Sequence, residues 1–84
     1  MLEIAYSKAA IRALTRMPTN TSKLIRGKVE QYAADPASLA NNVTVLKGEP
    51  GVMRLRVGDW RVVFTEDGHV LAVIRIAPRG GVYD

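Results

Sequence analysis

Three arginines in the stretch VMRLRVGDWRVVF, residues 52–64, are the side chains in this sequence whose type and spacing best suit chemistry. Arg54, Arg56 and Arg61 stand where a strand normally carries Val or Thr. An arginine side chain presents a planar fork of donors, which binds phosphate or carboxylate through two parallel hydrogen bonds. The stretch therefore predicts a site for an anion.

The turn inside this stretch brings the arginines together. Gly58 and Asp59 form a typical two-residue hairpin turn, and a turn of that length places Arg56 directly opposite Arg61. Alternate residues of a strand face opposite sides of the sheet. The three arginines therefore share one face, and the other face is apolar and predicted to be core: Met53, Leu55, Val57, Trp60, Val62 and Phe64.

The pairing of Arg56 with Arg61 needs an explanation, because like charges directly opposite each other destabilise a sheet by up to about 1 kcal/mol. A solvated polar face with splayed arginines is the simpler interpretation. Such a face normally mixes charges of both signs, yet the only acid between residues 52 and 63 is Asp59, in the turn. We therefore favour an anion site on this face.

A third apolar run, residues 69–77, follows Asp67 and Gly68. A two-residue turn at this point predicts that Arg61 pairs with Ile74, and it places Arg75 beside Trp60 in a cation–π contact. Residues 70–74 are apolar without a break, which is typical of a strand in the middle of a sheet with both faces covered. The arginine face is then expected to be concave.

The rest of the chain predicts two helices and two further strands. LEIAY (residues 2–6) and VTVLK (43–47) read as strands, and residues 8–17 and about 22–34 read as helices, the first capped by Ser7. Ile11 and Leu24 are expected on the apolar faces of these helices. The order predicts one α+β domain over residues 1–84: an N-terminal strand, an antiparallel helix hairpin, then three to four antiparallel strands with the helices on one face.

Composition narrows the classes of site and partner. The 84 residues carry a net charge of +4 with a pI near 9.9, no cysteine and one histidine. Disulfides and thiolate metal sites are excluded, and we expect no metal and no other cofactor. Neither a signal peptide nor a membrane span is predicted, so a cytoplasmic protein is expected. All five basic residues of the segment 51–84 are arginine, which favours a nucleic acid or an acidic protein segment as partner.

Four stretches of the chain carry a resemblance to known proteins: LEIAYSKAAIRALTRMP, EQYAADP, LKGEPGVMRLRVGDWRVVF and VLAVIRIAPRGGVY. They resemble the RelE/ParE superfamily of bacterial toxins from type II toxin–antitoxin systems. The resemblance covers nearly the whole chain, and the RelE-like branch is favoured. It implies an RelE-like fold, no membrane partner, and a cognate antitoxin protein that wraps the toxin. RelE-like members act with the ribosome and mRNA, cutting the mRNA by attack of a ribose 2′-hydroxyl on the next phosphate and so inhibiting translation.

The same resemblance implies roles for five residues. Arg54 and Arg56 resemble basic residues on a long strand of the family, and Arg61 resembles the arginine that clamps the scissile phosphate. Arg79 resembles a basic residue after the last strand. Tyr83 resembles the C-terminal tyrosine that stacks on a base or activates the hydroxyl, and Lys47 is a further RNA-binding candidate. Arginine keeps its proton in proteins, so Tyr83 is the best candidate for a general base in this set.

Two other functions stay open at this point. ParE-like members of the superfamily poison DNA gyrase, and such a function needs no phosphate site. A catalytically weak protein of RelE fold that only binds its antitoxin is the third possibility, with the arginine face as a groove for an acidic peptide. We further expect Arg61 to touch no core residue, so that Arg61→Ala should leave the fold intact.

Overall fold

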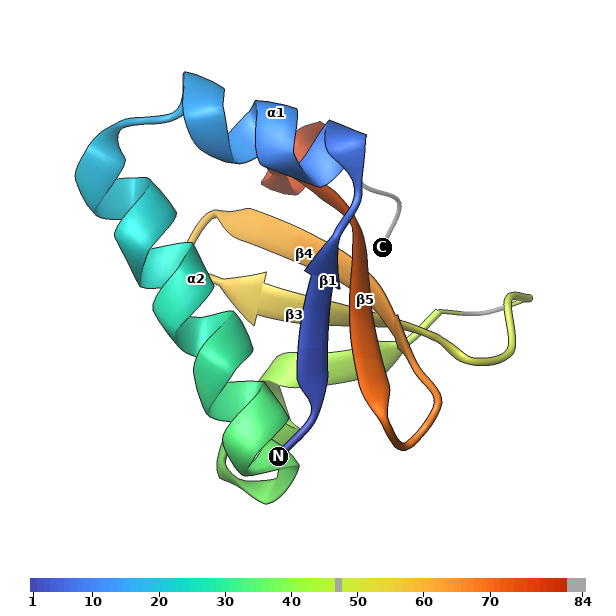
Figure 1. Ribbon diagram of the computed structural model, residues 1–84. Coiled ribbons are helices and arrows are strands. Elements are labelled where there is room, and N and C mark those ends of the chain that lie inside the picture. The colour runs from blue at the N-terminus through green and yellow to red at the C-terminus, as the bar shows by residue number, and fades with distance from the viewer. Residues whose placement is uncertain (47, 82–84) are drawn as a thin grey trace.

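The structure is a computed structural model that describes residues 1–46 and 48–81. Strands and helices follow the order expected from the sequence (Figure 1). In chain order they are β1 (Glu3–Tyr6), α1 (Lys8–Arg16), α2 (Thr19–Ala34), the 3₁₀ helix η1 (Pro36–Asn42), β2 (Val43–Val45), β3 (Val52–Val57), β4 (Trp60–Glu66), β5 (Val70–Pro78) and the 3₁₀ helix η2 (Arg79–Gly81).

The five strands form one sheet in the order β1-β5-β4-β3-β2. The pairs β2–β3, β3–β4 and β4–β5 are antiparallel, as predicted, whereas β1 lies parallel to β5. Both helices lie on the same side of this sheet, with α2 along the face and α1 across the end where β1 leads into it (Figure 1). The two helices diverge from their short connection, so the predicted helix hairpin is splayed (Figure 1). The α+β class is confirmed.

A single apolar core fills the space between the helices and the sheet. The predicted core face of β3 and β4 supplies Leu55, Val62 and Phe64, each at most 1% exposed. The ring of Tyr32 from α2 meets Phe64 edge-on, with centroids 5.0 Å apart. None of the helices in residues 1–46 and 48–81 is long and apolar enough to cross a membrane.

Two apolar residues predicted on the inner faces of the helices lie outside. Ile11 is 49% exposed and Leu24 is 54% exposed. The inner faces consist of residues three and four apart, such as Ala10 and Leu14 in α1. Ile11 and Leu24 are each one residue, or about 100° of helix rotation, away from such a position.

Local signals set the ends of both helices. Ser7 caps α1, since its hydroxyl accepts a hydrogen bond from the Ala10 amide at 3.0 Å. The same hydroxyl donates to the Ile74 carbonyl of β5. Helix α2 begins at Thr19, three residues before the predicted start at Ser22. Pro18 precedes it with a φ of −56°, which suits a helix start, and the polar residues after Pro18 are tolerated in a first turn whose amides have no helical partners.

The turn between β4 and β5 differs from the prediction. The Asp67 carboxylate accepts hydrogen bonds from the amides of His69 and Val70, at 2.8 and 2.7 Å, and closes a wider turn. These backbone donors, that of Val70 first, hold the pKa of Asp67 below its usual value. Glu66 consequently pairs with Leu71, and a bulge between Val63 and Phe64 shifts the register once more.

We predict that Ser7→Ala lowers the free energy of unfolding by about 1–2 kcal/mol, because the helix loses its cap and α1 loses a bond to β5. Urea unfolding followed by circular dichroism measures this. Thr15→Ala is the matched control, since the exposed Thr15 hydroxyl donates only to the Ile11 carbonyl of its own helix. Equal stability of the two variants would contradict the assigned role of Ser7.

Candidate anion-binding site

The β3–β4 hairpin places the three arginines as the sequence predicts. Arg56 pairs with Arg61 and Arg54 pairs with Val63, around the turn of Gly58 and Asp59. Gly58 has a φ of +57°, a value that side-chain-bearing residues rarely adopt, which explains the glycine at the first turn position. The register of this hairpin is therefore confirmed.

The arginine face is hollowed into a pocket of about 150 Å³, which we call the arginine pocket. Among the residues that the structure describes, its lining contains no carboxylate. It is lined by Arg54, Arg56, Arg61, Asn41, Asn42 and Thr44. The expected concavity is present, and its chemistry suits an anion with several hydrogen-bond acceptors.

Arg61 is more deeply placed than the sequence indicated. Its side chain is only 8% exposed, and its Nη1 donates to the carbonyls of Gly58 and Trp60, each at 3.0 Å. Arg61 is not part of the apolar core cluster, but it is buried and braces the hairpin turn. Nη1 is thereby held in place, while the Nε and Nη2 donors of the same guanidinium are not used in these two bonds.

Arg56 differs from Arg61 in its surroundings. Its side chain is exposed, and within residues 1–46 and 48–81 it makes no hydrogen bond or ion pair. One arginine of the facing pair is thus fixed and the other is available at the surface. A ligand anion between them would relieve their mutual repulsion, since it interacts favourably with both.

The neutral wall of the pocket was missed from the sequence. Asn41 and Asn42 end η1, and Thr44 lies in β2 opposite Arg54. Two consecutive asparagines before a short strand were the available signal, but they read equally well as an ordinary loop. The segment between β2 and β3 is too long for its sequence to fix the register of the two strands.

Arg75 was also misplaced by the sequence. The wider β4–β5 turn and the bulge pair Arg75 with Val63, while Trp60 pairs with Pro78. The predicted contact of Arg75 with Trp60 is therefore wrong. Because Val63 also pairs with Arg54, Arg75 lies on the arginine face, one strand away from the pocket.

Of the three remaining candidate residues, the structure describes only Arg79. Arg79 is exposed and follows β5, and its backbone amide donates to the Asp59 carbonyl at 2.7 Å, so it starts beside the β3–β4 turn without lining the pocket. Lys47 and Tyr83 lie outside the described residues.

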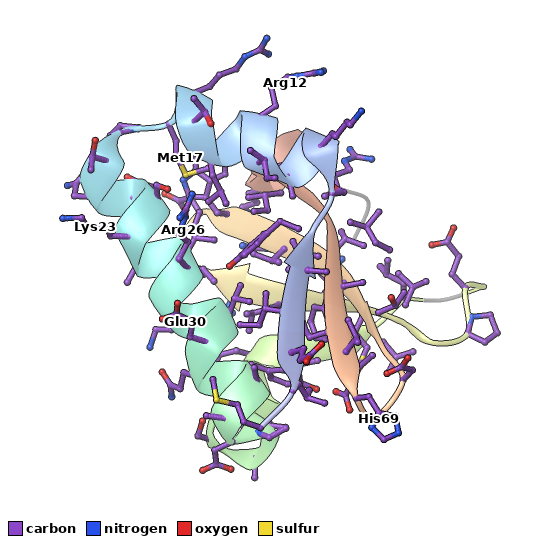
Figure 2. The ribbon with its side chains drawn as sticks, viewed as in Figure 1. Arg12, Met17, Lys23, Arg26, Glu30 and His69 are labelled. Atoms are coloured by element: carbon purple, nitrogen blue, oxygen red, sulfur yellow. The ribbon has the colours of Figure 1, made fainter. Side chains whose placement is uncertain are left out.

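His69 is in the β4–β5 turn (Figure 2), beyond the opposite end of β4 from Arg61. Residues 1–46 and 48–81 contain no group of three or more His, Cys, Asp or Glu that could hold a metal ion.

A family model described as the ParE toxin of the parDE type II toxin–antitoxin system matches residues 4–83. The chain belongs to this family. A comparison of this toxin with curated proteins gives no sequence match.

Solved structures share the fold of this toxin over almost its whole length. The archaeal RelE–RelB complex from Pyrococcus horikoshii OT3 matches with a TM-score of 0.79 at 21% identity, over 96% of this chain and 98% of that one. The intact E. coli RelBE complex matches with a TM-score of 0.75 at 16% identity, over 93% and 96% of the two chains. The YoeB dimer from Staphylococcus aureus gives a TM-score of 0.72 at 20% identity, over 88% and 92%. The expected superfamily and RelE-like fold are thus confirmed.

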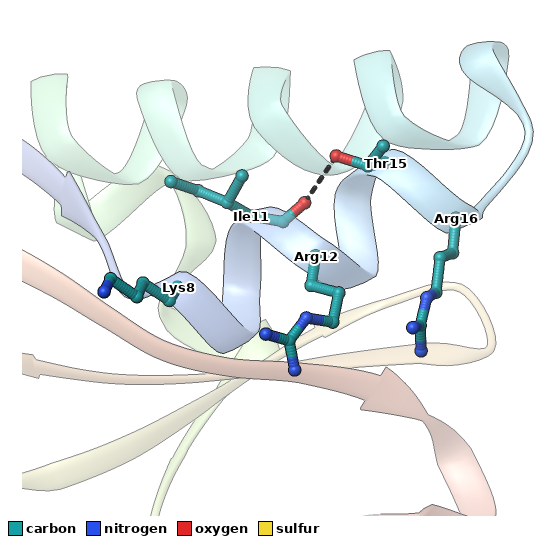
Figure 3. A pocket seen from close by; sticks show the side chains of 5 residues that line it. All are labelled: Lys8, Ile11, Arg12, Thr15 and Arg16. Carbon is teal, nitrogen blue, oxygen red and sulfur yellow. Dashed lines mark hydrogen bonds between the residues drawn. The ribbon is translucent and has the colours of Figure 1, made fainter.

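A second basic surface of the toxin lies on α1 and shares no residue with the arginine pocket. Figure 3 shows Lys8, Arg12 and Arg16 extending from one side of the helix, with Ile11 and Thr15 on the other. These five residues line a concavity of about 380 Å³. The Thr15 hydroxyl is already bonded to the Ile11 carbonyl at 2.8 Å. This surface therefore offers arginines that are exposed like Arg56 but are not part of the pocket.

We predict that Arg61→Ala lowers the free energy of unfolding of the toxin by about 1–3 kcal/mol, because the two turn carbonyls lose their buried donor. Arg56→Ala is the matched variant on the facing strand. It removes the like-charge repulsion and no bond within the described chain, so its stability should equal or slightly exceed that of the wild type. Urea unfolding of both variants measures the difference. A fully stable Arg61→Ala variant would show that the bonds to Gly58 and Trp60 do not brace the turn.

Proposed function

We propose that this toxin is a ribosome-dependent mRNA endoribonuclease that inhibits translation. The observation that carries the proposal is the arginine pocket, in which three arginines converge on one face of the sheet and the described lining holds no carboxylate. The likeness in fold to RelE and YoeB supports it. The reaction is attack of a ribose 2′-hydroxyl on the adjacent phosphorus, with rupture of the bond to the 5′-oxygen, leaving a cyclic phosphate and a free 5′-hydroxyl.

The arginines would act by binding the phosphate and its developing charge. The phosphorane that forms on attack carries more negative charge than the phosphodiester, so fixed cations stabilise it more than the ground state. In this proposal Arg61, held by the turn, and the exposed Arg56 clamp the phosphate from two strands. Arg54 adds a further positive charge from β3, and Arg79, beside the turn, offsets negative charge on the phosphate.

The proton transfers require groups that the arginines cannot supply. The described lining consists of arginine, asparagine and threonine side chains, and none of these types serves as a general base. Burial raises the pKa of Tyr6 and of Tyr32, and neither lines the pocket, so these two tyrosines are poor bases. Tyr83 is our candidate for the base that accepts the 2′-hydroxyl proton, and Lys47 is a candidate for contact with the RNA.

The partner in the cell is a cognate antitoxin. Membership in a toxin family of toxin–antitoxin systems supports this, as do the RelE–RelB and RelBE complexes that share the fold. Action on ribosomes requires the free toxin to be in the cytoplasm, and release from the antitoxin would then precede activity.

Inhibition of DNA gyrase is the second candidate function. The family description, ParE toxin, favours it, and so does a described pocket lining that holds no His, Lys, Tyr or carboxylate side chain. A toxin of this kind would use its surface to bind gyrase and would cut no RNA. A protein that only binds its antitoxin would act on neither target.

We predict that the purified toxin cuts mRNA on programmed ribosomes and leaves gyrase supercoiling unchanged. Arg56→Ala should lower the single-turnover cleavage rate by about 10²–10³, the usual cost of removing one donor to a developing charge. Arg12→Ala, which removes an equally exposed arginine from α1, should cut at the wild-type rate. Loss of supercoiling with intact mRNA would instead establish the gyrase function. If the mRNA stays intact and gyrase still supercoils DNA, antitoxin binding would be the only function left of the three.

For Tyr83 we predict that Tyr83→Phe keeps most of the affinity for RNA, because the ring that stacks on a base is retained. If the phenol takes the proton, the cleavage rate should fall by about 10²–10⁴, the worth of a positioned general base. Single-turnover cleavage on ribosomes decides this. Equal rates for Tyr83→Phe and the wild type would remove the base role and leave phosphate clamping and substrate orientation.

A further inference from the structure

We propose that Asn42 and Thr44 read the ribose 2′-hydroxyl of an RNA strand whose phosphates lie on the arginines, so that the arginine pocket selects RNA over DNA without reading the base. The inference deepens the proposed function and rests on RNA being the ligand. It assigns the neutral wall of the pocket a task distinct from that of the arginines.

The strand register places this wall directly against the cations. Thr44 pairs with Arg54 across β2 and β3, and Val43 pairs with Leu55. Continued by one residue, the same register brings Asn42 opposite Arg56. Alternate residues share a face, so Asn42 and Thr44 lie on the arginine face. Both line the pocket together with the arginines.

The polar groups of this wall are not used by the fold. Within residues 1–46 and 48–81, the side chains of Asn42 and Thr44 make no hydrogen bond. Some other small polar side chains are used by the fold: Ser7, Thr15 and Ser38 each bond a backbone carbonyl. Asn42 is half-buried beside the pocket, where an unused amide is worth more to a ligand than at an open surface.

The chemistry of the wall complements what arginine lacks. A guanidinium only donates hydrogen bonds, whereas an amide and a hydroxyl both donate and accept. The ribose 2′-hydroxyl also donates and accepts, and it is the group that distinguishes RNA from DNA. Phosphates would accept hydrogen bonds from the arginines, and a 2′-hydroxyl would pair with the amide and hydroxyl groups of the neutral wall.

The lining also argues against recognition of the base at this place. Proteins that read unpaired bases usually stack them on aromatic rings, and none of the six lining residues is aromatic. A volume of about 150 Å³, bounded by charged and amide groups, suits part of a sugar–phosphate backbone better than a stacked base. Selection by the sugar, independent of sequence, follows from this arrangement.

The test is a binding measurement without ribosomes, using the full-length toxin. Fluorescence anisotropy gives the Kd for a labelled six-nucleotide uridine RNA and for the matching deoxyuridine strand, at one fixed salt concentration. The wild type should bind RNA more tightly than DNA. Thr44→Val and Asn42→Ala should each weaken RNA binding about 3- to 10-fold, the effect of one lost hydrogen bond, and leave DNA binding unchanged. The double variant should bring the RNA-to-DNA ratio of affinities close to one.

Two controls separate sugar recognition from charge and from folding. Arg56→Ala should weaken RNA and DNA binding by the same factor, because a phosphate contact does not depend on the sugar. Thr15→Val, a matched change on α1 outside the pocket, should leave both affinities and their ratio as in the wild type. Urea unfolding of each variant confirms that the fold is retained.

The inference is overturned if the wild type shows no preference for RNA, or if Thr44→Val and Asn42→Ala weaken RNA and DNA binding equally. It stands if the preference is lost in the wall variants even when the toxin fails to cut mRNA on ribosomes. Failure to cut mRNA would remove the proposed endoribonuclease activity while leaving the pocket as an RNA-selective site. The two proposals therefore fail separately.

Discussion

Arg56 and Arg61 are held opposite each other across β3 and β4, where their like charges repel. The repulsion is worth up to about 1 kcal/mol. On the other face of the same hairpin Leu55, Val62 and Phe64 are each at most 1% exposed, and burying one such side chain stabilises the fold by roughly 1.5–3 kcal/mol. Burial of the core face therefore outweighs the repulsion and fixes the arginines in register.

The alternation of the strands couples the core to the site. A slip of one residue between β3 and β4 would turn the apolar side chains outward and the arginines inward, so the register that buries Phe64 is the one that assembles the arginine pocket. The turn adds a second constraint. Arg61 is bonded to the carbonyls of Gly58 and Trp60, and the Arg79 amide is bonded to the carbonyl of Asp59. The β3–β4 turn thus positions arginines from two parts of the chain, one through its side chain and the other through its backbone.

Sequence reasoning predicted the parts of the fold that local signals determine. Gly58 and Asp59 gave the right hairpin, and Ser7 gave the right helix start, because a turn type and a cap depend on neighbouring residues alone. It failed where a side chain changed a turn. The Asp67 carboxylate widens the β4–β5 turn, and the bulge at Val63 and Phe64 then moves Arg75 to the arginine face.

The pocket wall could not be predicted for a different reason. Asn42 and Thr44 reach the arginines only through the pairing of β2 with β3, and that pairing joins segments separated by a connection whose sequence does not fix its shape. Ile11 and Leu24 were wrongly predicted to be buried, because they are apolar but lie outside the inner faces of their helices. The roles of Lys47 and Tyr83 remain proposals, since both lie outside the described residues.

We propose that a phosphate of the ligand lies between Arg56 and Arg61. Nuclear magnetic resonance of the arginine Nε–Hε groups, recorded while a short RNA is titrated into the toxin, tests this directly, because each arginine gives its own signal. The signals of Arg56 and Arg61 should shift together and saturate at the same RNA concentration, while those of Arg12 and Arg16 on α1 should change little. Saturable shifts at Arg12 and Arg16 with unchanged signals from Arg56 and Arg61 would show that the RNA binds to α1 and not between Arg56 and Arg61.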